Sequence, residues 1–191
     1  MKVLKFGGAS VKNAENILKT IQIVRKSLEK TQVVVVVSAF EGITNKLVEA
    51  ANQAKAGNTV YAEIIKEITT THNNTIDILL QGERKEKNKL YVENLLQNLS
   101  NLLHGISLIK ELSARSLDII SSYGERLSAH IIADAMCEQG ISASYLDART
   151  VIKTDKTFGS AKVNFEKTDA NIRACYKNAS STFIATGFIA S

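Results

Sequence analysis

A lysine beside two glycines near the amino terminus is the first group of residues that could do chemistry. The run Lys5–Ser10 (KFGGAS) follows a short apolar segment and precedes an amphipathic one. Gly7 and Gly8 let backbone N–H groups approach a phosphate closely, and Lys5 supplies positive charge for a transferring phosphoryl group. The lysine precedes the glycines, so the spacing is not that of a P-loop. Taken alone, the run also fits a plain tight turn.

Hydroxyl groups follow the most apolar segment of the chain. The run Ser38–Asn45 (SAFEGITN) comes directly after five consecutive valines, 33–37. Ser38 and Thr44 therefore lie at the carboxyl end of a predicted buried strand, where open α/β sheets bind their ligands. The start of the next helix adds free N–H groups that favour an anion. Thr44 on its own could equally be a helix N-cap.

An acidic side chain stands in an apolar stretch of a third run, Ser121–Ser128 (SSYGERLS). A carboxylate in such surroundings needs a partner. Glu125 is satisfied by Arg126 or by solvent, or it binds the ammonium group of a substrate. The pattern alone leaves these alternatives open.

Together these runs resemble the aspartate kinase branch of the amino acid kinase family. Its patterns K-F-G-G, S-A-x-x-G-I-T-[ND] and G-E are matched in the family's order, followed by two further stretches. The matching segments are Lys5–Gly8, Ser38–Asn45, Tyr123–Arg126, Leu146–Arg149 with Thr154–Gly159, and Gly187–Ile189. A narrower similarity, to bifunctional aspartokinase–homoserine dehydrogenases, involves Met1 and Leu103–Leu108.

The resemblance implies that ATP phosphorylates the β-carboxylate of L-aspartate, giving 4-phospho-L-aspartate, the first step of lysine, threonine and methionine biosynthesis. Lys5 would stabilise the transferring γ-phosphoryl group. The phosphates of ATP would lie against Phe6, Gly7, Gly8 and Ser38. Mg²⁺ would arrive on those phosphates, and no metal site made of protein ligands is expected.

On the aspartate side, the resemblance implies that Thr44 binds the substrate, Glu125 holds its α-ammonium group and Phe188 lines the pocket. Ala9 stands where the family usually has Thr or Ser. The family's later motif T-L-G-R-G-G-S-D, which supplies an arginine and an aspartate, does not occur in these 191 residues. We therefore expect residues 1–191 to form the amino-acid-binding portion of the catalytic domain and to be inactive alone.

The order of elements predicts the fold that must position these groups. Apolar runs and helical periodicity alternate along the chain, which indicates an α/β sandwich with a mostly parallel sheet. Strands are predicted at 3–6, 33–37, 143–147, 150–154 and 182–186, and helices at 14–30, from 44, at 60–103 with a break at 81–83, at 116–138 and at 164–176. The resemblance implies a three-layer α/β/α amino acid kinase (carbamate kinase-like) fold, incomplete here, in which strand 182–186 keeps one open apolar edge.

Composition narrows the class of protein. The net charge is +5, but acids interrupt the bases and no aromatic residues alternate with them, so no nucleic acid partner is expected. No apolar stretch is long enough for a membrane span, and we expect a cytoplasmic protein. The resemblance implies a homo-oligomer, a dimer, when full-length. The alternatives are another amino acid kinase, acting on acetylglutamate or a nucleoside monophosphate, and a non-catalytic binding or oligomerisation module.

Overall fold

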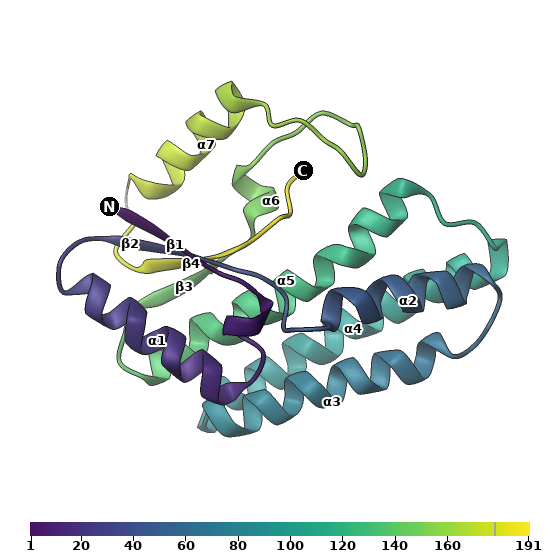
Figure 1. The fold of residues 1–191 in the computed structure, drawn as a ribbon, viewed down its shortest axis with the longest axis horizontal. Coiled ribbons are helices and arrows are strands. Elements are labelled where there is room, and N and C mark those ends of the chain that lie inside the picture. Colours follow the sequence, from purple (N-terminus) through teal and green to yellow (C-terminus); the bar gives the residue numbers. More distant parts are fainter. Residues whose placement is uncertain (178) are drawn as a thin grey trace.

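The computed structural model describes residues 1–177 and 179–191 (Figure 1). Strands and helices alternate along the chain, with a helical hairpin in the middle. The strands are β1 Lys2–Phe6, β2 Val33–Val37, β3 Ala143–Leu146 and β4 Thr182–Thr186. The helices are a 3₁₀ turn η1 Gly8–Ser10, α1 Ala14–Leu28, α2 Ile43–Lys55, α3 Tyr61–Leu79, α4 Gly82–Ile109, α5 Ala114–Glu138, α6 Ala148–Val151 and α7 Phe165–Tyr176.

The described strands form one parallel sheet in the order β1-β2-β4-β3. The valine strand β2 lies inside this sheet, and four of its five side chains are buried, as a strand covered on both faces requires. The expectation of an open edge on β4 is wrong, because β4 pairs with β2 on one side and with β3 on the other. Among the described strands, β1 and β3 are the edges.

Helices cover both faces of the sheet, so the predicted three-layer architecture is confirmed. Figure 1 shows α6 and α7 over one face, and α1 and α5 over the other. On the α7 face, the ring of Tyr176 meets the ring of Phe183 on β4 edge-on, with 4.9 Å between the centroids. On the opposite face, α5 packs against β3 and β4, and α2, α3 and α4 pack around α5.

Local sequence explains most boundaries of these elements. Helix α1 begins after Asn13, whose side-chain oxygen accepts a hydrogen bond from the N–H of Asn16 at 2.9 Å. Its apolar stripe Ile17, Ile21 and Val24 is buried against the core. The predicted interruption of the long helical region lies at the junction of α3 and α4, where α4 begins at Gly82.

The predicted strand at 150–154 is wrong. Residues Ala148–Val151 form the one-turn helix α6, which the Asp147 carboxylate caps by accepting a hydrogen bond from the N–H of Arg149 at 3.1 Å. The N–H of Ala148 also donates to Oγ1 of Thr186 at 2.8 Å, which fastens the turn to β4. Thr154 pairs with Val163 in an isolated antiparallel bridge that does not extend into a strand.

None of the helices in the described part of the chain combines the length and the apolar character that crossing a bilayer would demand.

Candidate functional site

The predicted phosphate-binding runs meet at the carboxyl edge of the sheet. Strands β1, β2 and β4 end level with one another, because Phe6 pairs with Val37 and Val37 pairs with Thr186. Two hydrogen bonds continue this alignment past the strand ends. The N–H of Ser38 donates to the carbonyl of Phe6 at 3.1 Å, and the N–H of Gly187 donates to the carbonyl of Val37 at 2.8 Å. Segments far apart in sequence thus form one rim.

The glycine turn after β1 packs directly on the loop after β2. A β-carbon on Gly8 would lie 3.3 Å from the carbonyl oxygen of Ala39 and 3.4 Å from Cα of Glu41, so a larger residue would press on the loop. Within the described chain, the N–H groups of Gly7 and Gly8 donate no hydrogen bond to another residue. The run is therefore a tight turn. Its free N–H groups are also donors of the kind that bind phosphate.

The Lys5 side chain rises from the end of β1 beside this turn. Its ammonium nitrogen lies 4.1 Å from the centroid of the Phe188 ring. No carboxylate pairs with Lys5 among the described residues. The structure therefore brings together two residues that the resemblance assigned to different substrates, and it leaves the lysine charge without an anionic partner.

Helix α2 begins close to the same rim. Gly42 is its N-cap with a φ of +81°, a left-handed conformation that glycine adopts without steric cost. Thr44 is the second residue of the helix and is exposed, so the N-cap interpretation of Thr44 is wrong. The N–H groups of Thr44 and Asn45 donate to no other residue in the described ranges. The hydroxyl of Thr44 and these N–H groups are free to bind a ligand.

Helix α5 approaches the loop after β2 closely because residue 124 is a glycine. A β-carbon on Gly124 would lie only 2.7 Å from Cβ of Ala39, so any other residue here would force the helix and the loop apart. The contact places Glu125, the next residue, against the segment that carries Ser38. In this way α5 delivers a carboxylate to the rim.

Glu125 is a buried carboxylate without a cationic partner among the residues that the structure describes. Only 6% of the residue is exposed, and burial raises the pKa of its carboxyl, while hydrogen bonds from its own N–H and that of Ala39 oppose the shift. Neither solvent nor Arg126, the two ordinary partners considered for this carboxylate, satisfies it. Solvent does not reach the carboxylate freely, and the guanidinium of Arg126 lies instead over the Tyr123 ring, 4.7 Å from its centroid. The prediction that Glu125 binds a ligand ammonium group is compatible with this environment.

Two residues that support the rim were missed by sequence reasoning. The hydroxyl of Ser128, one turn after Glu125, donates to the carbonyl of Ser38 at 2.7 Å. The ring of His72 on α3 stacks on Phe40, with 4.8 Å between the centroids and 12° between the planes. The i, i+3 spacing of Glu125 and Ser128 signals a shared helix face, whereas nothing local links His72 to Phe40.

The fourth matching stretch also reaches this edge. The guanidinium of Arg149 holds the carboxylate of Asp147, with 2.9 Å between Nε and Oδ1. Beyond α6, the N–H of Gly159 donates to Oδ2 of Asp118 at 2.7 Å, so this loop is fastened to the start of α5. These groups are already paired, and we assign them no direct role.

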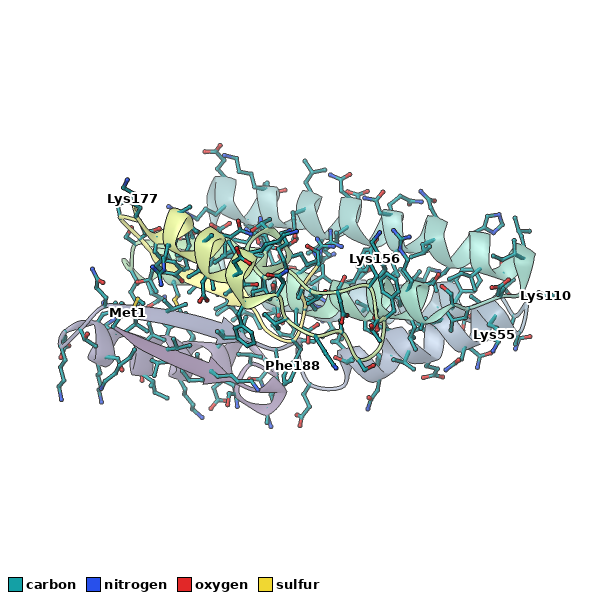
Figure 2. The ribbon with its side chains drawn as sticks, turned by 90° about the horizontal axis from the view of Figure 1, so that it is seen from above. Met1, Lys55, Lys110, Lys156, Lys177 and Phe188 are labelled. Carbon is teal, nitrogen blue, oxygen red and sulfur yellow. The ribbon has the colours of Figure 1, made fainter. Side chains whose placement is uncertain are left out.

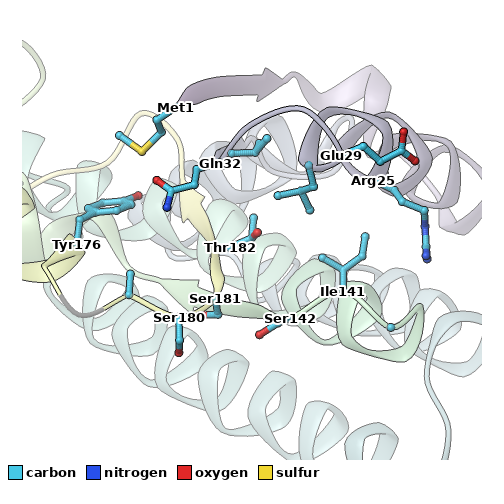
Figure 3. Close-up of a pocket in the computed structure, with 14 residues that line it drawn as sticks. Met1, Arg25, Glu29, Gln32, Ile141, Ser142, Tyr176, Ser180, Ser181 and Thr182 are labelled. Carbon is cyan, nitrogen blue, oxygen red and sulfur yellow. The ribbon is translucent and has the colours of Figure 1, made fainter.

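A pocket of about 670 Å³ lies at the opposite, amino-terminal edge of the sheet. Figure 3 shows it between the ends of α1 and α7 and the starts of β2 and β4, with Met1, Gln32, Ser142 and Thr182 among its lining residues. None of the predicted site residues lines this pocket. The rim at the carboxyl edge, made by the free donors, Lys5 and Glu125, is therefore the candidate site.

The chain is similar to known proteins over most or all of its length. The profile of the amino acid kinase family matches residues 1–191. The chain is 27% identical over its whole length to a bifunctional aspartokinase/homoserine dehydrogenase of Buchnera aphidicola, and 31% identical over 82% of its length to the aspartokinase of Candida albicans. The crystal structure of E. coli aspartokinase III in complex with aspartate and ADP superimposes with a TM-score of 0.86 at 27% identity over 99% of the chain. The chain spans 24%, 29% and 41% of these three proteins.

Proposed function

This chain belongs to the amino acid kinase family, and from that premise we propose that its site takes part in the phosphorylation of the β-carboxylate of L-aspartate by ATP. The observation that carries the proposal is the buried carboxylate of Glu125 at the rim that also holds the charge of Lys5, neither of which has an ionic partner within residues 1–177 and 179–191. An amino acid with an ammonium group and two carboxylates, placed next to a phosphoryl donor, satisfies both charges. The aspartokinase relatives and the aspartate and ADP complex of E. coli aspartokinase III support this choice of substrates.

On the phosphate side, the site offers charge and free N–H donors. We propose that Phe6, Gly7, Gly8 and Ser38 lie against the ATP phosphates and that Lys5 stabilises the γ-phosphoryl group as negative charge spreads over its oxygens. Donors held in place before the reaction act on the developing charge without a cost of reorganisation. Mg²⁺ bound to the ATP phosphates offsets part of their negative charge.

On the aspartate side, Glu125 holds the α-ammonium group, the Thr44 hydroxyl binds the substrate, and Phe188 lines the pocket. An oxygen of the β-carboxylate attacks the γ-phosphorus in line with the bond to ADP. A new phosphorus–oxygen bond forms, the bond to the ADP oxygen breaks, and ADP leaves with that electron pair. The product is a mixed anhydride, and no general base is required because the carboxylate is already ionised.

The proposal extends to the gene product that contains this chain. We propose that it acts in the biosynthesis of lysine, threonine and methionine, in the cytoplasm, as a homo-oligomer such as a dimer. The aspartokinase relatives are several times longer than the chain, so these proposals concern the whole protein.

Calorimetry with a pair of ligands tests the role of Glu125. Succinate resembles aspartate but lacks the ammonium group. In the full-length gene product, we expect aspartate to bind roughly 10- to 150-fold more tightly than succinate, the range for a hydrogen bond to a charged group. Glu125→Gln should abolish this difference by weakening aspartate alone.

Glu49→Gln, at an exposed position on α2, is the matched control and should keep the preference for aspartate. Equal binding of the two ligands by the unmodified protein would contradict the assignment of Glu125. It would then favour an acceptor without a free ammonium group, such as acetylglutamate.

A further inference from the structure

The segment that follows β4 is held at both ends. At its start, Gly187 is bonded to the Val37 carbonyl at 2.8 Å, and an added β-carbon would lie 3.0 Å from that oxygen. At its end, Ser191 donates its N–H to the carbonyl of Ile152 at 3.0 Å and accepts from the N–H of Thr154 at 2.9 Å. The residues between these anchors form a short bridge across the carboxyl edge of the sheet, which fixes where the side chain of residue 188 is presented.

Phe188, at the start of this bridge, has two unfavourable features. Its φ is +57°, which is rare for a residue with a bulky side chain, and 82% of it is exposed. Strained backbone conformations of this kind cluster at functional sites. Figure 2 shows Phe188 beside the amino-terminal segment of the chain, where its ring meets the Lys5 ammonium at 4.1 Å.

Apart from this contact, little restricts the position of the Lys5 ammonium group in the described structure. Its side chain is exposed, has four rotatable bonds and has no carboxylate partner among the described residues. A cation held over an aromatic face is attracted by the ring without being neutralised by a negative charge. The ring can therefore restrict the ammonium group and leave its full charge available to an anion.

We propose that Phe188 is a positioning residue for Lys5, holding the ammonium group over the phosphate-binding turn through a cation–π contact. This inference rests on the proposed function, in which Lys5 acts on the transferring phosphoryl group. It adds to the role that the resemblance implied, since the ring then also serves the phosphate side of the site through Lys5.

Two substitutions distinguish an effect of the aromatic face from an effect of side-chain size. Phe188→Leu keeps an unbranched β-carbon, and hence a similar backbone strain, but removes the π face. Phe188→Trp restores a π face, the strongest of the three aromatic types for this contact. Phe165→Leu makes the same change at a phenylalanine on α7 that is 71% exposed, and it is the matched control.

The first readout is the proton spectrum of the Lys5 side chain in the full-length gene product, assigned by its disappearance in Lys5→Arg. We expect the Lys5 ε-methylene resonance to be shifted upfield by the ring current of Phe188. Phe188→Leu should return it to the position of ordinary lysines, while Phe188→Trp and Phe165→Leu should keep it shifted.

The second readout is steady-state phosphoryl transfer from ATP to aspartate. Phe188→Leu should lower kcat by about fivefold, the contribution of a cation–π contact at an exposed site, with KM for ATP unchanged. Phe188→Trp should restore kcat.

An unshifted Lys5 resonance in the unmodified protein, an unchanged or raised kcat in Phe188→Leu, or an effect confined to the KM for aspartate would overturn the inference. If the unmodified protein transfers no phosphate to aspartate, the proposed function fails, and the spectra still decide independently whether Phe188 holds Lys5.

Discussion

Lys5 and Glu125 carry opposite charges at one rim, and neither has an ionic partner in the described structure. A buried unpaired carboxylate is unfavourable for folding, because water stabilises the ionised form better than the protein interior does. Arg126, the nearest cation in sequence, lies over Tyr123 instead of neutralising Glu125. Such an arrangement suits a site whose missing charges arrive with its ligands.

We predict that Lys5→Met in the full-length gene product lowers the rate of phosphoryl transfer by roughly 100-fold or more, the effect of removing one preorganised donor. The fold should survive, because Lys5 is exposed at the end of an edge strand. Stopped-time assays and a thermal melt measure both quantities. Lys2→Met, at the other end of β1, is the control and should retain activity. Near-normal turnover in Lys5→Met with an intact melt would show that Lys5 has another role.

Motifs in the sequence predicted the residues of the candidate site better than they predicted the contacts. Lys5, Gly8, Ser38 and Glu125 could be selected because their types and spacing match a phosphate turn and a carboxylate in an apolar helix. The contact of Lys5 with Phe188 could not be predicted, since it depends on a positive φ and on the pairing of β1, β2 and β4.

At the scale of elements, helix α5 and the loop after β2 form the framework of the site. Gly124 permits the close approach, Ser128 bonds to the Ser38 carbonyl, and His72 on α3 supports the loop through Phe40. The long helices and the valine strand follow from local periodicity and were predicted, but α4 runs on to Ile109, past the predicted end at residue 103. The one-turn helix α6 was not predicted, because its cap and its bond to Thr186 on β4 are tertiary features.

The stack of His72 on Phe40 predicts a pH dependence of stability. Burial lowers the pKa of His72 to about 4, against 6.5 for an ordinary histidine. Between these values the unfolded chain binds a proton that the folded chain does not, so this residue makes stability fall as the pH is lowered from 6.5 towards 4. The slope contributed by one such group is about 1.4 kcal/mol per pH unit.

His72→Phe keeps an aromatic ring against Phe40 and removes the titrating group. We expect denaturant titrations at pH 7 and pH 5 to show a smaller loss of stability on acidification for the variant, by roughly 2 kcal/mol. An identical loss in both proteins would mean that His72 is protonated within the folded state, which contradicts its burial.

At the scale of the whole molecule, β4 is paired with a strand on each side. The alternation of strands and helices predicted the fold class, whereas the strand order could not be predicted, because the pairing of β3 with β4 is non-local. The rim offers the positive charge of Lys5, free N–H donors and the carboxylate of Glu125. The arginine and aspartate of the family's later motif have no counterpart in these residues.

We therefore predict that residues 1–191 alone show no measurable aspartate kinase activity and at most weak binding of aspartate. Groups that act together on a transition state lose most of their effect when part of the set is absent. A coupled assay of the purified chain with ATP, Mg²⁺ and aspartate measures the rate. Turnover comparable to that of a full-length aspartokinase would show that this part carries a complete site.

The most direct test of the central claim is the acceptor preference of the full-length gene product. The protein is incubated with ATP, Mg²⁺ and, in turn, aspartate, acetylglutamate and a nucleoside monophosphate, and the acyl phosphate is trapped with hydroxylamine while ADP is measured in parallel. Our account predicts ADP and an aspartyl hydroxamate with aspartate, a rate near background with the other acceptors, and loss of the product in Lys5→Met. Phosphorylation of another acceptor in preference to aspartate, or binding of aspartate without any turnover, would contradict it.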